Sequence, residues 1–600
     1  MPIQGLPTKT HVCDLCVVGG GLAGTIAAVS AARRGLRVVL MQDRPVLGGN
    51  SSSEIRMWVR GAKGTYDRET GLLEEMEEEN VYRNPTLSAS GWDLTLYSTV
   101  RAEKNITLLL NCSCLRAERE GREIRRITGW QLNTYTFHTV EARLFADCSG
   151  DSILAHLTGA PYRHGREANA EYGETIGPAE ADGKTMGSSC LLQARETDHP
   201  VPFTPPEWAY RYDTDEDMAA VPVNGVEYAV PRLHRVGTDG GNLWWIEIGG
   251  EGDTLRDADE NRDELLRIAL GVWDHIKNRG DHDRDNWELE WIGFLPGKRE
   301  SGRYIGAHVL TQQEISAGGL FPDVVAYGGW PMDDHDPRGF YAKGERDPAS
   351  RMFPAPSPYG IPYRCLYSEA IPNLFFAGRN ISATHAAISS TRVMGTCSLL
   401  GQAVGTAAAL CGKYGVLPAG LFPHRVDELQ QALLEDGVFL PGVPRRVPDL
   451  TREARLSLAP EETAVLQNGT ERPRTEPGEN AVTLPLGSSV TFAFDAPRQV
   501  EALRFYADPD YTRETVSVNK KMRVFPMRLH TGRDFVPVRV AATIVKAFTV
   551  TADGEEIFSA ENNYHALVTV PVRREVRSLT VTFRETHGAP AVRLFACDIR

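Results

Sequence analysis

The chain has 600 residues, more than one hydrophobic core can hold, and its 42% hydrophobic and 24% charged residues are typical of globular proteins, so we expect two or three domains. A formal net charge of −14 disfavours nucleic acid as a partner, because phosphate backbones repel an acidic surface. The first ten residues have no apolar signal segment and no apolar run approaches bilayer length, so we expect a cytoplasmic protein without a membrane partner.

The first predicted unit is a strand, a glycine turn, a helix and a second strand. Residues 14–18 are a short apolar run that ends in glycines, which is typical of a strand buried on both faces of a parallel sheet. An alanine-rich helix is predicted over 22–34, closed by Gly35, and residues 36–41 form the next buried strand. This order is a βαβ unit, so the sequence predicts an α/β domain of the Rossmann type.

The turn between that strand and helix carries Gly19, Gly21 and Gly24, which have the spacing Gly-x-Gly-x-x-Gly. The first glycine permits the tight turn, the second lets the backbone approach a pyrophosphate, and the third lets the helix pack against the strand. The helix opens with Leu22 and Ala23, whose N–H groups and helix dipole favour a phosphate. The pattern therefore predicts a dinucleotide site; a glycine-rich turn without a ligand is the alternative.

The second strand ends at Gln42, where an acidic residue usually binds the adenosine ribose; Asp43 and Arg44 follow it. A glutamine carbonyl can still accept a hydrogen bond from a ribose hydroxyl. The loop that comes next is rich in glycine and hydroxyl residues and is suited to lie along a phosphate or a flavin edge, although such a run can also be a plain loop. Its residues expected at the cofactor are Gly48, Gly49, Asn50, Ser51 and Ser52.

The middle of the chain departs from the βαβ pattern. Three strand-like runs between residues 105 and 146 predict an antiparallel meander inserted as a crossover, which leads to Gly150 and Asp151. Residues 161–364 are irregular, with many Trp, Gly and Pro residues and one clear helix near 259–278. We expect an α+β substrate domain in this region.

A buried strand over 373–377 marks the return of the chain to the first domain. It is followed by Gly378, Arg379 and Asn380, and then by a long helix of small residues that starts near Gly395, Thr396 and Cys397. We therefore expect one discontinuous domain made of residues 1–160 and 365–415. Residues 416–482 read as a helical and linker segment, and period-two alternation over 483–600 predicts a carboxyl-terminal all-β sandwich.

These motifs resemble those of the FAD-dependent oxidoreductases with the glutathione-reductase-like flavin fold, in the branch with a Leu-Gly-Gly-Asn-Ser-Ser loop. The resemblance covers both ends of the first 415 residues well and the middle loosely. The segments that carry it are 17–24, 44–54, 146–151, 373–380 and 392–405.

The resemblance implies an extended FAD, with its adenine end at the glycine turn. The usual acidic contact to the ribityl chain is absent, because the late Gly-Asp or Gly-Glu pair reads Gly378-Arg379 here, and Arg379 is expected to reach a phosphate instead. The helix that starts near Gly395 is expected to point its amino-terminal end at the N1/C2 edge of the flavin, where negative charge accumulates on reduction.

Two histidines and one arginine are the candidate catalytic residues. A dehydrogenase acting on alcohols needs a base, and imidazole suits neutral pH. His385 is the first choice because it lies close in sequence to two flavin segments, and His335 is the second; each could instead be a loop histidine or a covalent flavin tether. Arg392 could clamp a substrate carboxylate or hydroxyl, or pair with a neighbouring acid.

A metal site is not expected. The run Asp333, Asp334, His335 and Asp336 has suitable ligand types, but the side chains of adjacent residues point apart and rarely converge on one ion.

We interpret the chain as an FAD-dependent dehydrogenase of a small polar substrate, favoured as a sugar, glycoside or polyhydroxy acid because the carboxyl-terminal domain resembles galactose-binding-like sandwiches. The electron acceptor and the oligomeric state, including a homo-oligomer, are left open. One alternative is a flavin reductase of an unsaturated acid or an NAD(P)H-fed hydroxylase. Another is a carbohydrate-binding scaffold that retains FAD or only the fold.

Overall fold

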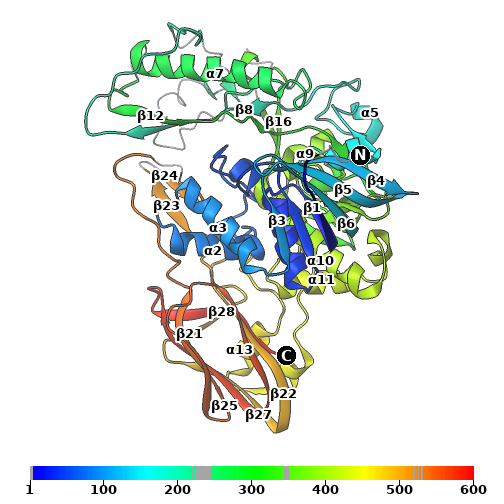
Figure 1. Cartoon of the computed structure of the whole chain (residues 1–600). Helices are drawn as coiled ribbons and strands as arrows, with labels where there is room; N and C mark the ends of the chain where they lie inside the picture. Colours follow the sequence, from blue (N-terminus) through cyan, green and yellow to red (C-terminus); the bar gives the residue numbers. More distant parts are fainter. Residues whose placement is uncertain are drawn as a thin grey trace.

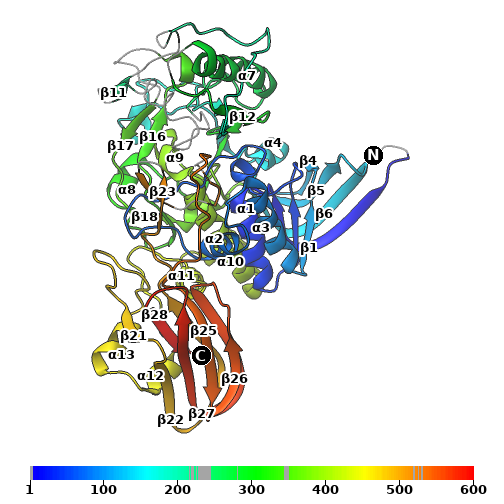
Figure 2. The ribbon, with the colours of Figure 1, turned by 90° about the vertical axis from the view of Figure 1, so that its left-hand side faces the viewer.

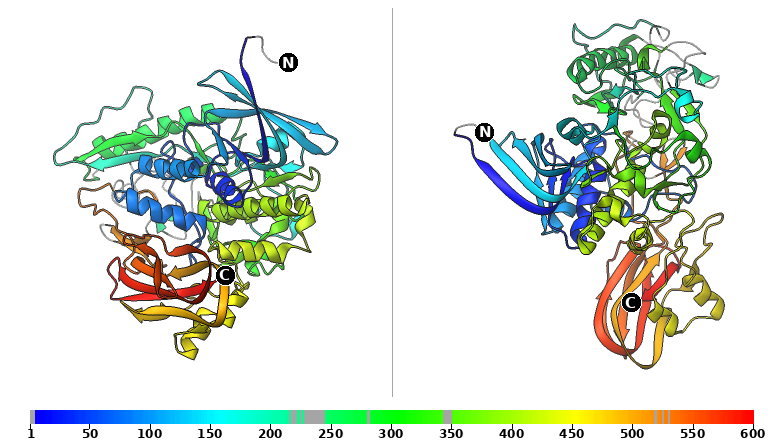
Figure 3. Two further views of the ribbon diagram at one scale, coloured as in Figure 1. Left: turned by 60° about the horizontal axis from the view of Figure 1, so that its bottom comes forward. Right: turned by 90° about the vertical axis from the view of Figure 1, so that its right-hand side faces the viewer.

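The computed structural model describes residues 5–214, 217, 222–223, 226–227, 245–279, 282–342, 350–517, 520–523, 526–528 and 531–600. A mixed α/β body lies at the centre of Figure 1, a segment that contains helix α7 (Ala258–Asp274) lies above it, and a separate antiparallel sheet lies below. Figure 3 shows the start of the described chain on the ribbon that projects from the central sheet, and the carboxyl terminus in the antiparallel sheet.

The central body is built on a seven-stranded sheet. Its strands are β1 (Thr8–Val18), β2 (Val38–Met41), β3 (Ile106–Leu109), β4 (Cys112–Glu120), β5 (Glu123–Gln131), β6 (Thr136–Asp147) and β19 (Leu374–Phe376). The order is β3-β2-β1-β6-β5-β4, with β19 also pairing β6. β1, β2, β3, β6 and β19 pair in parallel, whereas β4, β5 and β6 form antiparallel pairs. The predicted Rossmann-type sheet with a meander crossover is confirmed.

Strand β6 joins the meander and the returning strand to one sheet. Residues 136–141 of β6 pair with β5, and residues 145–147 of the same strand pair in parallel with β19. The meander and the start of β1 project from the body as a ribbon in Figure 2. The last residues of β6 therefore lie between β1 and β19, at the carboxyl edge of the parallel strands.

Helices cover this sheet and bring distant segments to its carboxyl edge. They are α1 (Leu22–Arg33), α2 (Leu72–Arg83), α3 (Ala89–Ala102), α4 (Ile153–Thr158), α9 (His385–Thr391), α10 (Met394–Tyr414) and α11 (Val426–Glu435). α10 packs directly on α1, because a Cβ at Gly401 would lie 2.1 Å from the Ala23 carbonyl oxygen and one at Gly405 would lie 2.3 Å from the Ala27 carbonyl oxygen. Glycine at these positions lets the two helices touch along their backbones.

Helix α10 differs from the expectation that no apolar run is long enough to cross a bilayer. By length and composition its 21 residues would suffice, and among the described residues it alone meets that criterion. Of its most apolar stretch, 89% is buried inside the protein, so the apolar side chains of this helix pack in the core.

The middle of the chain carries α7 and several short strand pairs. The predicted helix near 259–278 corresponds to α7, which continues as a π-helical turn over His275–Arg279. The other helices are α5 (Asn169–Tyr172) and α8 (Gln312–Ser316). The strands are β7 (Tyr162–Arg163), β8 (Ser188–Ser189), β9 (Leu192–Glu196), β10 (Pro222–Val223), β11 (Val226–Glu227), β12 (Trp287–Ile292), β13 (Gly297–Lys298), β14 (Arg303–Tyr304), β15 (Val324–Gly328), β16 (Met332–His335), β17 (Ser350–Phe353) and β18 (Tyr359–Pro362).

The carboxyl-terminal part is an antiparallel sheet in the order β21-β28-β22-β27-β25-β26, with β20 pairing β22. Its strands are β20 (Arg455–Leu456), β21 (Val482–Pro485), β22 (Ser489–Ala507), β25 (Val545–Ala552), β26 (Glu555–Ala560), β27 (Leu567–Thr586) and β28 (Ala591–Ile599), beside the pair β23 (Glu514–Ser517) and β24 (Lys520–Arg523). Of two short helices, α12 (Asp449–Glu453) precedes β20 and α13 (Pro460–Leu466) lies between β20 and β21.

The strands β22 and β27 have 19 and 20 residues and are interrupted by register shifts, so they bend around one hydrophobic core. The alternation along the sequence thus predicted an antiparallel sheet correctly. Its description as a galactose-binding-like sandwich, and the four domain boundaries, stay predictions.

Candidate functional site

A cavity of about 950 Å³ opens at the carboxyl ends of β1, β2 and β6, the edge at which α/β sheets bind ligands. Most of the predicted cofactor residues line it, although they come from five separate segments. Those on its wall are Gly19, Gly21, Leu22, Ala23, Gln42, Asp43, Arg44, Gly48, Gly49, Asn50, Gly150, Asp151, Gly378, Arg379 and Cys397.

The glycine turn has the shape that a pyrophosphate requires. Gly19 has a φ of +99°, and a Cβ there would lie 2.5 Å from the Cys148 backbone; a Cβ at Gly24 would lie 1.8 Å from the Gly19 carbonyl oxygen. At Gly21, by contrast, the nearest atom to an added Cβ is 3.9 Å away, so this position is open towards the cavity. α1 has no side-chain cap, which leaves its first N–H groups available to an anion. The turn fits a dinucleotide.

Gln42 lines the cavity, and its amide also binds neighbouring backbone. Its Oε1 accepts a hydrogen bond from the Gly20 N–H at 2.6 Å, and its Nε2 donates to the Val46 carbonyl oxygen at 3.2 Å. Gln42 thus holds the glycine turn in place; its oxygen can accept a second hydrogen bond, and the ribose contact stays a prediction. Asp43, whose side chain is 61% exposed, is the carboxylate at this end of the cavity.

Asp151 lies between two cations on the cavity wall. Its carboxylate is 2.6 Å from Arg379 Nη2 and 2.6 Å from Lys298 Nζ, and Ser301 Oγ donates to it at 2.9 Å. Burial alone would raise the pKa of Asp151, but the charges of Arg379 and Lys298 outweigh it and lower the pKa to about 2. Asp151 thus places a carboxylate next to Gly378-Arg379 on the cavity wall, and Arg379 pairs with it.

The remaining predicted cofactor residues lie behind the cavity wall and shape it. Ser51 Oγ donates to the Gly48 carbonyl oxygen at 2.9 Å, Asn380 Nδ2 lies 3.4 Å from Asp147, and the Gly395 N–H donates to the Arg60 carbonyl oxygen at 2.7 Å. Gly24, Ser52 and Thr396 are also outside the lining.

The far end of the cavity has side chains that the sequence reasoning missed. Trp58, Arg60, Lys63 and Trp330 line it. Arg60 lies 5.0 Å from the Trp58 ring and 5.6 Å from the Trp330 ring, and the Lys63 ammonium lies 4.7 Å from the Trp330 ring. A signal for this wall was present, because residues 57–63 directly follow the glycine and serine loop.

His335 lies on the wall at this same end, on β16. Its Nδ1 is 2.6 Å from Glu247 Oε2 and its Nε2 is 3.2 Å from Asp333 Oδ2. Burial alone would lower the pKa of His335, but the two carboxylates, Glu247 first, raise it. Arg299 is 3.2 Å from Glu247, and Arg392 donates to the Asp333 carbonyl oxygen at 3.1 Å. Sequence reasoning named His335 and Arg392, but not the carboxylates that hold the imidazole.

His385 is absent from the cavity wall, which corrects its ranking as the first choice for a base. Its Nδ1 is 2.9 Å from Glu300 and its Nε2 is 3.0 Å from Asp334, so both ring nitrogens are occupied. Burial would lower the pKa of His385, but Glu300 and Asp334 raise it to about 10. The buried imidazolium cannot accept a proton at neutral pH and instead anchors the start of α9.

The acidic run around His335 is split among different partners. Asp333 pairs with His335, Asp334 with His385, and Asp336 with Arg338 at 2.7 Å. Within the described ranges, no group of three or more His, Cys, Asp or Glu side chains is placed to hold a metal ion.

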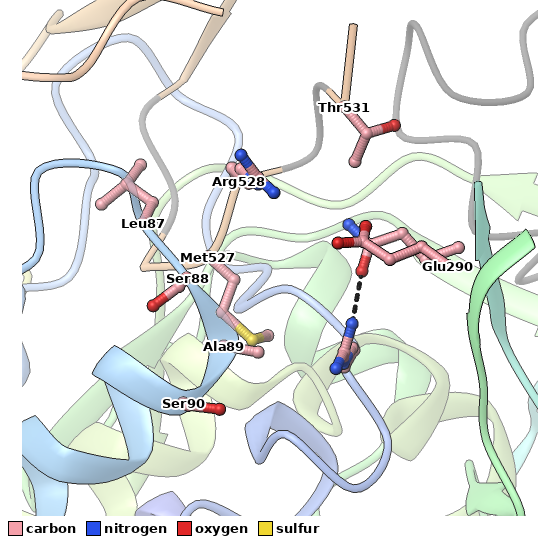
Figure 4. A pocket seen from close by; sticks show the side chains of 10 residues that line it. Leu87, Ser88, Ala89, Ser90, Glu290, Met527, Arg528 and Thr531 are labelled. Atoms are coloured by element: carbon pink, nitrogen blue, oxygen red, sulfur yellow. Dashed lines mark hydrogen bonds between the residues drawn. The ribbon is translucent and has the colours of Figure 1, made fainter. Parts of the chain in front are cut away.

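A second, smaller cavity of about 140 Å³ lies between the start of α3 and the side chains of Met527, Arg528 and Thr531 (Figure 4). Ser88, Ala89, Arg528 and Thr531 line it, and Arg56 donates to Gln193 Oε1 at 2.8 Å across it. The two cavities share no lining residue.

Parts of this chain are similar to known proteins. A family model described as FAD dependent oxidoreductase matches residues 14–433. The glycerol-3-phosphate dehydrogenase of Mycobacterium leprae and glycerol-3-phosphate dehydrogenase 2 of Mycobacterium tuberculosis are each 35% identical over 79 residues, which are 13% of this chain and 14% of theirs. The match thus spans about one seventh of the length of these relatives.

Solved structures give a weaker likeness. A p-nitrophenol 4-monooxygenase from Pseudomonas putida has a TM-score of 0.31 at 10% identity, covering 70% of this chain and 86% of that one. The glycerol-3-phosphate dehydrogenase from Bacillus halodurans, complexed with FAD, has a TM-score of 0.19 at 15% identity, covering 32% and 43%. The family model, in contrast, covers the glycine turn, the returning strand and α10, so the chain belongs to the FAD-dependent oxidoreductases, and its cofactor is FAD.

Proposed function

We propose that this oxidoreductase oxidises a CH–OH group of a polyhydroxylated small molecule, with His335 as the acceptor of the hydroxyl proton. The observation that carries the proposal is the continuity of the cavity, which extends from the glycine turn to His335. Bound FAD supplies the hydride acceptor, the N5 atom of its ring. The alcohol becomes a carbonyl, because its carbon loses a hydride and its oxygen loses a proton.

The acid–base work is assigned to His335 because of its position and its partners. Glu247 holds Nδ1 at 2.6 Å, so the longer contact, 3.2 Å from Nε2 to Asp333, is the one that a substrate hydroxyl can replace. Because the carboxylates raise its pKa, His335 loses its proton at a higher pH than an ordinary imidazole and gains its proton-accepting form as the pH rises. Oxidation is therefore expected to speed up with increasing pH.

A polyhydroxylated substrate is proposed from the side chains that surround His335. The indole rings of Trp58 and Trp330 offer apolar faces against which the C–H face of a sugar can pack. Arg392 lies beside Asp333 and offers donors to hydroxyl or carboxylate oxygens. The galactose-binding-like reading of the carboxyl-terminal sheet supports the same substrate class by analogy.

The test is a visible spectrum of the purified protein, followed by anaerobic addition of sugars, glycosides, polyols and hydroxy acids. The proposal predicts that at least one of these compounds bleaches the flavin band and is recovered as its carbonyl product. A flavoprotein that no compound of the panel reduces, but that NAD(P)H reduces directly, would refute it in favour of the hydroxylase alternative.

A second candidate is the reverse type of chemistry, reduction of an unsaturated acid. One observation favours it: the Glu247 and Asp333 carboxylates on either side of His335 favour its protonated form, which is a proton donor. Chemically reduced enzyme mixed with unsaturated acids distinguishes the two. Rapid return of the flavin band with an unsaturated acid, without oxidation of any alcohol, would select the reductase.

A further inference from the structure

One wall of the substrate end of the cavity comes from a segment without helix or strand. Residues 57–70, called here the 57–70 loop, contribute Met57, Trp58, Arg60 and Lys63 to the cavity lining. Because secondary structure does not order this segment, contacts with other parts of the chain must offset the conformational entropy of holding it in one shape. The shape of the wall therefore depends on what binds the 57–70 loop.

A single buried arginine binds the second half of this loop. Arg472 lies between α13 and β21 in the carboxyl-terminal part and is 1% exposed. Its Nη1 donates to the Tyr66 carbonyl oxygen at 3.0 Å. Its Nη2 donates to the Arg68 carbonyl oxygen at 3.2 Å and to Thr70 Oγ1 at 3.4 Å. The guanidinium thus ties the loop to a part of the chain that is about 400 residues away in the sequence.

Aromatic rings fix the position of the Arg472 guanidinium. Its central carbon lies 4.1 Å from the centre of the Phe439 ring, 5.0 Å from that of Tyr511 and 5.6 Å from that of Tyr327. The Tyr327 hydroxyl also donates to the Arg68 carbonyl oxygen at 2.7 Å. A planar guanidinium can stack on rings and donate several hydrogen bonds at once, so these surroundings suit an arginine and give it one orientation.

The loop also places a side chain inside the carboxyl-terminal part. The Tyr66 ring belongs to a hydrophobic cluster whose other members all come from that part of the chain. They include Tyr506, Tyr511 and Phe595. The hydrogen bond from Arg472 and the burial of the ring therefore hold the same residue of the loop from the same side.

Glu69 connects this hold to the cavity wall. It lies between two residues that Arg472 binds, and its Oε1 accepts the Ala62 N–H at 2.7 Å. Ala62 in turn lies between two residues of the cavity lining. A displacement of the second half of the loop therefore moves Glu69 away from Ala62 and releases the wall.

We propose that Arg472 is a positioning residue for the substrate end of the cavity: it holds the 57–70 loop in the shape that binds substrate. The carboxyl-terminal part then completes the site rather than forming a separate binding module. The inference rests on the proposed function, which makes this end of the cavity the substrate end. Arg472 is outside the cavity lining, and the glycine turn that fits FAD has its own anchor in Gln42, so FAD binding is not expected to depend on Arg472.

Hydrogen exchange of the FAD-loaded protein, read by mass spectrometry, tests this hold directly. In Arg472→Met, peptides that cover the 57–70 loop are expected to exchange about tenfold faster than in the wild type, because strong hydrogen bonds to the loop are lost. The exchange of peptides that cover α1, and the flavin content per protein, should stay unchanged. Arg472→Lys should restore part of the protection, since an ammonium over the same rings can still donate.

Two more variants make the comparison specific. Tyr564→Ala is the matched control, because the Tyr564 ring stacks on Tyr82 of α2 at 3.9 Å and so joins the carboxyl-terminal part to the body through residues outside the 57–70 loop. In this control the loop should exchange as in the wild type. Tyr327→Phe keeps the ring beside Arg472 but removes the hydroxyl that binds Arg68, so we expect a smaller acceleration in the same peptides. Tyr327→Phe decides the test if Arg472→Met does not fold.

The effect on substrate is measured by anaerobic single-turnover bleaching with glucose, gluconate and sorbitol at varied concentrations. For a compound that bleaches the wild type, Arg472→Met is expected to raise the half-saturating concentration about tenfold and to change the limiting rate less than about twofold. The reason is that the wall binds the substrate before and during the reaction alike, whereas His335 takes the proton. A residue needed only for folding would lower the amount of active enzyme and leave the half-saturating concentration in place.

Equal exchange of the 57–70 loop in the wild type and Arg472→Met, or the same acceleration in Tyr564→Ala, would overturn the inference. Faster exchange with an unchanged half-saturating concentration would also overturn it, because the shape of the wall would then not matter to the substrate. Failure of the proposed function looks different: no compound bleaches the flavin, while the loop still exchanges faster in Arg472→Met. That result would remove the dehydrogenase and retain Arg472 as the residue that fixes this wall.

Discussion

Replacing Glu247 by glutamine tests the assignment of His335 most closely. The Glu247 carboxylate has three partners at once: Oε1 accepts the Gly187 N–H at 2.7 Å, and Oε2 lies 2.6 Å from His335 Nδ1 and 3.2 Å from Arg299 Nε. A glutamine has one oxygen for all three. If that oxygen stays with Gly187, the amide NH₂ faces His335 and forces the neutral imidazole to carry its proton on Nε2, the nitrogen that must accept one.

The magnitude follows from the charge that is lost. Removal of one close, buried opposite charge lowers the pKa of His335 by about 1 to 3 pH units, which corresponds to about 1.4 to 4 kcal/mol. The raised pKa of folded His335 contributes stability below its ordinary pKa, and that stability is lost as pH rises through the folded value. Glu247→Gln is therefore expected to shift the rise of the oxidation rate to lower pH and to reduce its plateau.

The assay is anaerobic stopped-flow bleaching of the flavin across pH, with the best substrate of the panel. Glu314→Gln is the control, because Glu314 pairs with His308 at 2.9 Å outside the cavity and should leave the profile in place. An unchanged profile in Glu247→Gln, or a wild-type rate that falls with increasing pH, would refute His335 as the base.

Two further predictions concern the cofactor end. Gly21→Val should abolish FAD binding without lowering the melting temperature of the apoprotein. The backbone tolerates a side chain here, because φ is −61° and the nearest atom, the Gly49 Cα, is 3.9 Å from the new Cβ, whereas the side chain enters the cavity. The flavin absorbance per protein and thermal melting measure the two effects. Asp151→Asn should lower the free energy of unfolding by about 2 kcal/mol near neutral pH, because Lys298 and Arg379 lower the pKa of Asp151 to about 2. The difference in stability from the wild type should vanish as the pH falls towards that value. Thermal melting as a function of pH measures it.

Each has a contrary result. A Gly21→Val protein that retains flavin would show that the cofactor phosphates lie elsewhere than at the start of α1. An Asp151→Asn protein as stable as the wild type at neutral pH would show that the two flanking cations do not depend on this carboxylate.

The parts of the fold that follow from local chemistry were predictable from the sequence. The glycine turn needs a positive φ at Gly19 and contact with backbone at Gly24, and few arrangements other than a strand followed by a helix meet both needs. Alternation likewise predicts the antiparallel carboxyl-terminal sheet. The bends of β22 and β27 depend on register shifts between them, which the alternation of apolar and polar residues does not predict.

The residues of the candidate site were predictable only where they belong to a sequence motif or lie next to one. Nearness in sequence to flavin segments favoured His385, but pairing across 85 and 51 residues, with Glu300 and Asp334, removes it from the cavity. His335 gains its role from Glu247, 88 residues away. Gln42 binds the Gly20 N–H, 22 residues away, as well as lining the cavity. Such long-range partners are set by tertiary packing, which a single sequence does not contain.

The most direct test of the account compares wild type and His335→Gln in single-turnover bleaching under anaerobic conditions, with both proteins loaded with FAD. The account predicts equal flavin content and bleaching that is about a hundredfold or more slower in the variant, because the proton acceptor is gone. Bleaching of His335→Gln at the wild-type rate would contradict the central claim that His335 takes the substrate proton.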